Sequence, residues 1–363
     1  MIRRSMLSGL LLVSAVLLNA CSTGSYFWQA TTGHLRVLGA AENIDEVLLR
    51  PDLSGKLRTQ LQYVQEIREF SVVQLGLPDN RSYRTYADLN RAYAVWNVVA
   101  SQPDSLTLET WCFPLIGCIS YKGFYSESRA VALADDLRKQ GLDVAVLGVP
   151  AYSTLGFTPD PVLNTFVNYP AGELARLVFH ELAHQVVYIA DDTMFNESFA
   201  TAVEELGVIA WLAQPGREVL KAQYDLFDSR RNAFRLMLAR ARDDLERIYE
   251  NSNRLDMRQV LRLKEQRFKQ LLDDYDALKE SWGGWAGYDR FMAEDLNNAK
   301  LGVSGLYTQY VPAFKALHNL CDQSFQRFYA ATEMLGEFSR EQREILLAEL
   351  QRAEPLSFGF KCL

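Results

Sequence analysis

The chain contains 363 residues, of which 48% are hydrophobic and 23% charged, a composition typical of globular proteins. This length allows one large domain or two ordinary ones, each with a buried core. The chain has 38 Lys and Arg residues against 45 Asp and Glu, and the net charge of −7 argues against nucleic-acid binding. The one long apolar run lies at the extreme N-terminus, which excludes a membrane protein with several spans.

The N-terminal segment has the pattern of a bacterial export signal. A pair of arginines precedes an apolar stretch over residues 6–18, which is short for a membrane span. The Leu-Asn-Ala that precedes Cys21 resembles a lipoprotein processing site, where cleavage leaves the cysteine as an acylated N-terminus. We therefore expect a signal peptide over residues 1–20 and a mature chain, 21–363, that is held by its lipid anchor alone. Ser22 favours the outer membrane, with the body in the periplasm; a secretory signal with a chance cysteine is the alternative.

Four further cysteines remain in the mature chain, an even number that predicts two disulfides in an oxidising compartment. We expect each cysteine to pair with its near neighbour, which gives Cys112–Cys118 and Cys321–Cys362. Four free, buried thiols are the alternative. A zinc site formed by these cysteines is disfavoured because the spacing C-x5-C is wide for a zinc knuckle.

The order of periodic segments predicts one mostly helical α+β domain. A dense run of charged residues and leucines from 217 to 281 predicts a long antiparallel helical hairpin, inserted in that domain. Runs rich in β-branched and aromatic residues predict strands at 92–100, 106–113, 118–124 and 143–149. Helical spacing predicts helices over 33–75 (with a break at Pro51), 126–140, 173–189, 196–212 and 324–352.

The sequence FHELAHQ contains the pattern H-E-x-x-H on a predicted helix. His180 and His184 are four residues apart, so their side chains lie on one face and can bind one metal ion. Glu181 follows the first histidine, where its carboxylate can reach a metal-bound water and act as a general base. The alternative is a pair of histidines with no metal on an amphipathic helix.

Glu197 is the expected third ligand, because it lies on the next predicted helix, thirteen residues after the second histidine. Two histidines, one glutamate and water form a common catalytic zinc set. Asp191 and Asp192, in the loop between the helices, are rival ligands. The three-histidine pattern H-E-x-x-H-x-x-G-x-x-H is excluded, since Val187 and Ala190 occupy the positions of its Gly and its last His.

Glu204 follows Glu197 by two helical turns on the same face. It can accept a hydrogen bond from a ligand imidazole and fix its tautomer. The alternative is an ordinary ion-paired or solvent-facing glutamate.

HELAH followed by NESFA resembles the gluzincin class of zinc metallopeptidases. More closely, the chain resembles a bacterial family of predicted zinc aminopeptidases that are lipoproteins, from about residue 30 to the C-terminus. The metal motif is characteristic of the class, and the WCFP…GC and AYSTLG blocks are characteristic of the family. The matching stretches are RTYADL, WCFPLIGCISYKGFYS, GVPAYSTLG, LVFHELAHQVVY and FNESFATAVEELG.

The resemblance implies a zincin-like core with a small mixed sheet, one Zn²⁺ on His180, His184 and Glu197, and Glu181 as base. It also implies a peptide substrate and aminopeptidase activity. The chain departs from the aminopeptidase-N type in a shorter gap before Glu197 and in lacking a G-x-M-E-N segment. Cleavage at the amino end is therefore less firmly implied than peptide-bond hydrolysis.

Stabilising the oxyanion of such a reaction usually needs a further donor, and Tyr307 is the preferred candidate. Tyr310 and His318 are alternatives, and a packing role is the other interpretation of any of these tyrosines. The aromatic segment 282–288, with its three glycines, either lines a substrate cleft or caps the helical hairpin.

Residues 151–156 precede the zinc helix, where an edge strand pairs with the substrate backbone in zincins. We expect such a strand here, with Ala151, Tyr152, Ser153 and Thr154 contacting substrate. A structural turn leading into the helix is the alternative.

The sequence thus predicts a periplasmic zinc-dependent peptidase, with aminopeptidase activity expected first. The alternatives are an endopeptidase, a cell-wall amide hydrolase, and a non-catalytic lipoprotein that uses the fold as a scaffold. The expected partners are a peptide substrate and, through the lipid anchor alone, a membrane. Nucleic acid is not expected, and the sequence identifies no protein partner.

Overall fold

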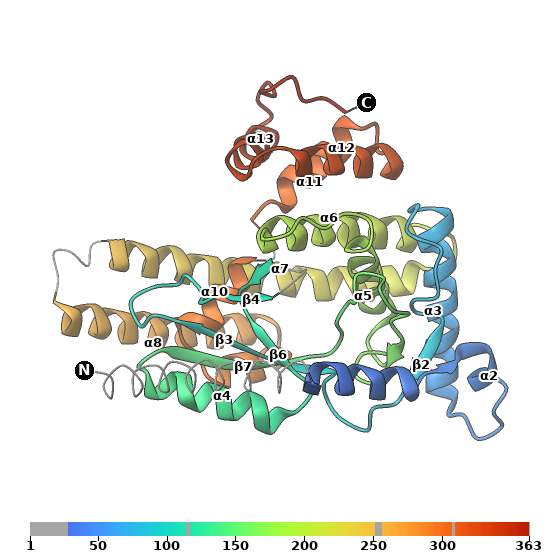
Figure 1. The fold of residues 1–363 in the computed structure, drawn as a ribbon, viewed down its shortest axis with the longest axis horizontal. Helices are drawn as coiled ribbons and strands as arrows, with labels where there is room; N and C mark the ends of the chain where they lie inside the picture. The colour runs from blue at the N-terminus through green and yellow to red at the C-terminus, as the bar shows by residue number, and fades with distance from the viewer. Residues whose placement is uncertain (1–27, 114–116, 251–255, 307–308, 363) are drawn as a thin grey trace, which may run out of the picture.

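The computed structural model describes residues 28–113, 117–250, 256–306 and 309–362, which form a mostly helical α+β structure (Figure 1). A helix over residues 28–39 opens the described chain. The later helices are α2 (Ile44–Leu48), α3 (Gly55–Val73), α4 (Glu127–Lys139), α5 (Ala171–Ala183), α6 (Thr193–Leu212), α7 (Glu218–Glu250), α8 (Met257–Ser281), α9 (Asp289–Ala293), α10 (Asn298–Leu306), α11 (Val311–Leu320), α12 (Phe325–Glu337) and α13 (Arg340–Arg352).

The strands of the described residues form three small sheets. One has the order β1-β2-β8, the second β6-β3-β7, and the third is the hairpin β4-β5. Only the β2–β8 pair is parallel among these strands. The strands are β1 (Glu42–Asn43), β2 (Thr85–Ala87), β3 (Val95–Ser101), β4 (Trp111–Phe113), β5 (Gly117–Ile119), β6 (Lys122–Phe124), β7 (Asp143–Val149) and β8 (Val162–Leu163).

Helices cover both faces of the β6-β3-β7 sheet, because side chains alternate along its buried strands. Val98 and Val144 point to the face that packs on α4. Val99 and Ala145 point to the opposite face, which packs on α10. The sequence predicted both β3 and its partner β7, at 92–100 and 143–149.

The largest hydrophobic core joins the N-terminal helices, the α5–α6 pair and the C-terminal helices. Phe314 of α11 contacts Phe195 and Phe199 of α6, with ring centroids 5.1 and 5.7 Å apart. The C-terminal helices therefore rest on α6, the helix that carries Glu197 (Figure 1).

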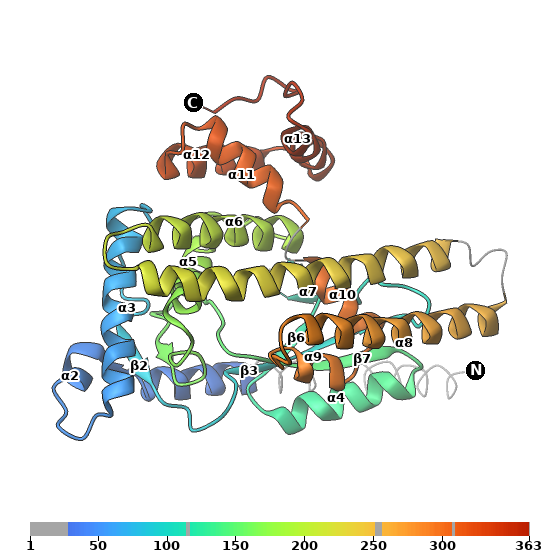
Figure 2. The same cartoon turned by 180° about the vertical axis from the view of Figure 1, so that it is seen from behind.

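The segment from 217 to 281 consists of two long helices, α7 and α8, that lie side by side and extend away from α6 (Figure 2). They have a core of their own, which includes Phe234, Leu271 and Tyr275. Tyr288, in the aromatic segment 282–288, stacks on Phe234 with ring centroids 3.9 Å apart. The aromatic segment therefore packs on the hairpin, as the capping interpretation predicts. None of its residues lines the cavity that contains the histidines.

Several predicted elements differ from the structure in extent or continuity; the strand expected over 118–124, for example, is divided into β5 and β6, which belong to different sheets. The strand expected over 106–113 is limited to Trp111–Phe113. The helix expected over 173–189 ends as α5 at Ala183, and the helix expected over 324–352 is two helices. A capping box at Ser339, with Gln342 as its partner, starts α13 and so separates it from α12.

Both predicted disulfides are present, Cys112–Cys118 within the β4–β5 hairpin and Cys321–Cys362 between α11 and the C-terminal segment. The pairing of near neighbours is therefore confirmed. The processing site at Cys21 and the signal peptide lie outside the described residues. Across the part of the chain that the structure describes, none of the helices has the length and apolarity that a membrane span requires.

Candidate metal centre and catalytic cavity

The three predicted metal ligands come together where α5 packs on α6. His180 lies in the last turn of α5, His184 caps that helix, and Glu197 lies near the start of α6. The Nε2 atom of His180 is 3.2 Å from His184 Nε2 and 3.2 Å from Glu197 Oε2. Glu197 Oε2 and His184 Nε2 are 3.8 Å apart. Of the described residues, these alone form a cluster that could hold a metal ion.

The cluster has the dimensions that a zinc ion requires. Ligands placed about 2.0–2.1 Å from a tetrahedral Zn²⁺ are separated from one another by about 3.3 Å. The three observed separations lie close to that value. Two imidazole nitrogens and one carboxylate oxygen also match the ligand preference of Zn²⁺. The residues therefore fit the ion.

The hydrogen bonding of His180 also favours a cation in the cluster. Its Nδ1 is 3.1 Å from Glu204 Oε2, and a carboxylate can only accept, so Nδ1 carries the proton. In the neutral ring the Nε2 atom then carries an unshared electron pair, and this atom faces Glu197 Oε2 at 3.2 Å. Two acceptors at this distance repel each other unless a cation or a proton lies between them.

The charges of His184 and Glu197 suit metal binding as well. Burial lowers the pKa of His184 to about 4, so this imidazole is neutral at pH 7 and can donate its lone pair. Burial alone would raise the pKa of Glu197. The facing imidazoles of His184 and His180 outweigh that effect and lower it, so the carboxylate stays ionised.

Glu204 belongs to a buried chain of charges that links the cluster to the hairpin. It is 6% exposed, and it pairs with Arg176 of α5 as well as with His180. Arg176 is 3.7 Å from Glu173, which in turn pairs with Arg231 of α7 at 2.7 Å. Glu204 therefore lies behind a candidate ligand and is also ion-paired, as one form of the alternative has it; it is not solvent-facing.

Glu181 lines the same cavity as the cluster. Burial raises the pKa of its carboxyl to about 7, while the nearby His180 opposes that shift and Glu197 adds to it. A carboxylate with such a pKa can accept and release a proton near neutral pH. The position and the acidity both suit a general base.

The two rival ligands are engaged elsewhere. Asp191 accepts a hydrogen bond from the backbone N–H of Cys118 at 2.6 Å. Asp192 caps α6 by accepting from the N–H of Phe195, and its other oxygen is 2.8 Å from Arg343. Among these acidic residues, only Glu197 therefore faces the histidines.

Asn196, which the sequence analysis did not single out, explains how Glu197 is positioned. Its side-chain oxygen accepts from Ile189 N–H at 2.8 Å, and its nitrogen donates to Ile189 C=O at 2.7 Å. α5 has already ended at Ala183, and this clamp satisfies the backbone of Ile189 in the short return that leads into α6. Its position directly before the expected ligand Glu197 is the sequence feature from which such a positioning role could have been predicted.

The metal cluster opens into a cavity of about 580 Å³, a size typical of small-molecule and peptide sites. Its walls come from β3, β5, β6, β7, α5, α6 and the N-terminal helix 28–39. Its lining includes the metal cluster, Glu181, Ala30, Tyr125, Tyr152, Ser153, Leu177 and Tyr188.

The predicted substrate segment lines this cavity, but the prediction of a strand over 151–156 is wrong. Ala151, Tyr152, Ser153 and Thr154 all border the cavity in an irregular stretch that follows β7. Thr154 Oγ1 is 2.9 Å from Asp160 Oδ1 and accepts from Thr158 N–H at 3.2 Å. These bonds close a turn, in which Leu155 and Gly156 have positive φ angles, and prevent extended pairing.

The expected oxyanion donor, Tyr307, lies outside the described residues. The alternatives Tyr310 and His318 do not line the cavity; His318 packs against Phe325 and Phe328 in the C-terminal helices. Tyr188 does line it, and burial, with a further contribution from Glu197, raises the pKa of its phenol. It follows His184 by four residues, a spacing that could have drawn attention to it.

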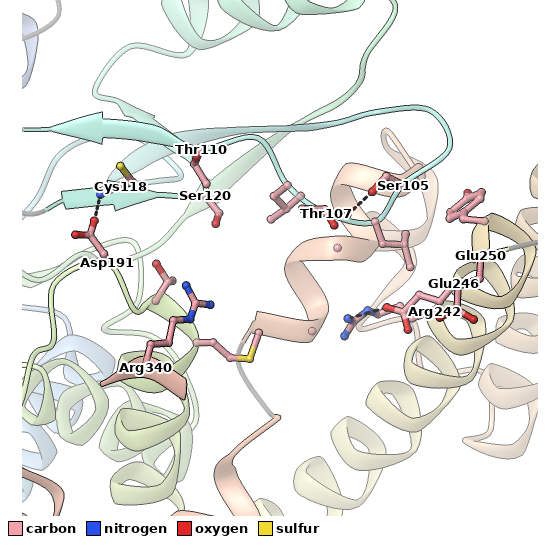
Figure 3. A pocket seen from close by; sticks show the side chains of 17 residues that line it. Ser105, Thr107, Thr110, Cys118, Ser120, Asp191, Arg242, Glu246, Glu250 and Arg340 are labelled. Carbon is pink, nitrogen blue, oxygen red and sulfur yellow. Dashed lines mark hydrogen bonds and ion pairs between the residues drawn. The ribbon is translucent and has the colours of Figure 1, made fainter. Parts of the chain in front are cut away.

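A second cavity of about 740 Å³ adjoins the first, and Thr193 lines both. Figure 3 shows Arg242 and Glu246 of α7 on one side of it and Arg340 of α13 on the other. Arg242 pairs with Glu246 at 3.6 Å, and Arg340 pairs with Glu344 at 3.2 Å. These ion pairs account for its two arginines, and we assign no chemistry to this cavity.

Asp160 leads to a prediction for the pH dependence of stability. It is buried, and burial raises the pKa of its carboxyl from 3.8 to about 6, against the hydrogen bonds from Thr154. The folded protein therefore holds this proton more tightly than the unfolded chain. The stability contribution is complete below about pH 4 and is lost as the pH rises through about 6, by about 3 kcal/mol at most.

Asp160→Asn keeps the shape of the side chain but cannot ionise. We expect the free energy of unfolding of the variant, relative to the unaltered protein, to rise between pH 4 and pH 7. Urea unfolding of both proteins in the presence of a chelator measures this difference without a contribution from bound metal. Parallel pH profiles for the two proteins would contradict the assignment of the raised pKa to Asp160.

The comparisons with known proteins identify one family. The family model described as "Putative aminopeptidase" matches residues 25–347. No curated protein and no solved structure matches the chain. Membership supports a hydrolase with a peptidase-like function and a peptide substrate. Because the match covers most of the 363 residues, the chain belongs to the Putative aminopeptidase family.

Proposed function

We propose that this protein is a zinc-dependent peptidase with a zincin-like catalytic core and aminopeptidase activity. The observation that carries the proposal is the convergence of His180, His184 and Glu197 at separations suited to one Zn²⁺, with Glu181 in the same cavity. These three residues correspond to the ligand set of the gluzincins, the class that the sequence resembles. Family membership supports the peptidase part of the proposal.

The ion, when bound, contributes Lewis acidity that polarises the scissile carbonyl and lowers the pKa of the attacking water. Glu181 accepts a proton from that water and later transfers it to the leaving amine. Glu204 holds the Nδ1 proton of His180, which orients the ring and keeps Nε2 free to act as a ligand. Tyr188 lines the cavity and is the described tyrosine that we propose as a donor to the oxyanion.

We also propose that Cys21 carries the lipid anchor and that the catalytic domain faces the periplasm from the outer membrane. The lipoprotein-like site before Cys21 supports this location. The two disulfides support an oxidising compartment.

The test is the metal content of the mature protein, purified without added metal and measured by elemental analysis and chelator competition. We expect about one zinc per chain, and a loss of affinity of at least about 100-fold in Glu197→Gln, because an amide oxygen is a poorer ligand than a carboxylate. Glu205→Gln is the matched control, since Glu205 follows on the same helix and pairs with Arg235 and Lys315 instead. A protein that neither contains nor takes up zinc would refute the proposal.

A further inference from the structure

The catalytic cavity has one wall that the ligand set and the base do not explain. Ala30 of the N-terminal helix, Tyr125 after β6, and Tyr152 form this wall, which we call the aromatic wall. The rings of Tyr125 and Tyr152 meet edge to face with centroids 5.6 Å apart. The wall reaches the reaction centre, because Ser153 follows Tyr152 and its Oγ lies 3.5 Å from the backbone oxygen of Glu181.

The N-terminal helix is fixed to the edge strand of the sheet by Gln29. The N–H of Tyr125 donates to Gln29 Oε1 at 3.2 Å, and Gln29 Nε2 donates to Gly123 C=O at 3.5 Å. The side-chain amide therefore takes the backbone groups that a neighbouring strand would pair with. Figure 1 shows the dark blue helix 28–39 lying beside β6.

One face of this helix is shaped to the aromatic wall. Ala30, Gly33 and His34 are spaced i, i+3 and i+4, so they share a face. Gly33 lies against the ring of Tyr125, and a Cβ at that position would overlap the ring. The absence of a side chain at Gly33 therefore allows the close approach that brings Ala30 to the cavity.

His34 holds the wall from behind. Its Nδ1 is 2.8 Å from the hydroxyl of Tyr152, and its Nε2 is 2.9 Å from the hydroxyl of Thr158. Burial lowers the pKa of His34, which favours the neutral ring with one donor and one acceptor. Two hydroxyls can satisfy both nitrogens of that ring, so the helix and the segment after β7 are clasped together.

We infer that the aromatic wall is a subsite for an apolar side chain beside the scissile bond, and that Ala30 limits the size of that side chain. The inference rests on the proposed function and adds a substrate class to it: peptides with an aliphatic or aromatic residue next to the cleaved bond. Val95, Val149 and Leu177 line the same cavity. None of these wall residues carries a charge, so a charged side chain would lose hydration against them without gaining an ion-pair partner.

The test fills the subsite from the helix. Ala30→Leu adds a branched side chain to the wall, whereas Thr31→Leu adds the same side chain at the exposed next position and is the matched control. The zinc-loaded mature protein is assayed for kcat/KM on leucyl, phenylalanyl and alanyl 4-nitroanilides. We expect the unaltered protein to favour leucyl over alanyl by at least about 10-fold, and Ala30→Leu to reduce this preference by at least about 10-fold.

A second variant guards against misfolding of the first. Ala30→Gly enlarges the subsite, and we expect it to raise the ratio of kcat/KM for phenylalanyl over alanyl by about threefold or more. Thr31→Leu is expected to leave both ratios unchanged. Equal effects of Ala30→Leu on all three substrates, or unchanged ratios in both Ala30 variants, would overturn the inference.

A binding measurement separates this inference from the proposed function. Calorimetry with leucinamide and alaninamide, on the Glu181→Gln protein and on that protein with Ala30→Leu, needs no turnover. Tighter binding of leucinamide that Ala30→Leu abolishes would support the subsite even if no substrate were hydrolysed, in which case only the peptidase assignment would fail. Hydrolysis without any dependence on side-chain size would sink the subsite and leave the peptidase assignment intact.

Discussion

Replacing Glu181 with glutamine is expected to lower kcat/KM for peptide hydrolysis by about 10²- to 10⁴-fold while the zinc content stays at one per chain. Glutamine keeps the size of the side chain, but its amide cannot take a proton from water. Glu181 lines the cavity beside the candidate ligands and is not one of them, so the metal affinity is expected to change little. Steady-state kinetics and elemental analysis on the same preparation measure both quantities.

The zinc content makes this experiment decisive for the role of Glu181. Loss of activity together with loss of zinc would mean that the residue supports the metal site rather than proton transfer. Activity within about threefold of the unaltered protein would exclude it as the general base. The variant also supplies the inactive protein that the binding measurements on the aromatic wall require.

Replacing Glu204 is expected to affect both the metal and the fold. Glu204→Gln can still accept the Nδ1 proton of His180, but it loses the charge that faces Arg176, so we expect zinc affinity to fall about 10- to 100-fold. Glu204→Ala leaves the buried guanidinium of Arg176 with a single acidic partner among the described residues, Glu173 at 3.7 Å. We therefore expect it to lower the free energy of unfolding by about 3 kcal/mol.

Glu205→Gln is the control for this pair, because its partners Arg235 and Lys315 are about a third exposed. Ion pairs whose cations reach solvent contribute little, so its stability should stay within about 1 kcal/mol of the unaltered protein. Chelator competition and urea unfolding, run in parallel on the three variants, measure the two effects. Unchanged zinc affinity in Glu204→Gln would show that the contact with His180 does not tune the site.

The buried ion pairs also link the helical hairpin to the candidate metal site. Arg231 of α7 pairs with Glu173, which lies one turn from Arg176 on α5. The hairpin packs on its own apolar core, yet this ion pair ties it to the helix that carries both histidines. A charge run in the sequence predicts two helices, but it does not specify which of its charges is buried.

The local features of the site followed from the sequence because they depend on short spacings. The helical period alone places His180 and His184 on one face. Proximity along the chain was enough to predict the disulfides, whose cysteines are separated by 6 and by 41 positions in the sequence. The charge and leucine pattern of 217–281 was likewise enough to predict two long helices.

The strand predicted over 151–156 shows where such local rules stop. The segment contains β-favouring residues, but Thr154 bonds to Asp160 and closes a turn instead. Side chains that bond to nearby polar groups compete with strand pairing, and the outcome depends on the buried surroundings of Asp160. α5 likewise ends earlier than predicted: the N–H groups of Gln185 and Val186 bond back by only three residues, which tightens the chain after Ala183, and Asn196 then holds Ile189 in the return to α6.

The sequence by itself thus predicted the candidate ligand pair and the candidate base, together with the cysteine pairing and the helical hairpin that the structure contains. The tertiary structure decided that Glu197 rather than Asp191 or Asp192 faces the histidines, and that Glu204 stands behind His180. It alone brought the N-terminal helix to the cavity through Gln29 and His34. The physical reason is range: a period or a short loop fixes neighbours along the chain, whereas contacts between distant segments depend on how the whole core packs.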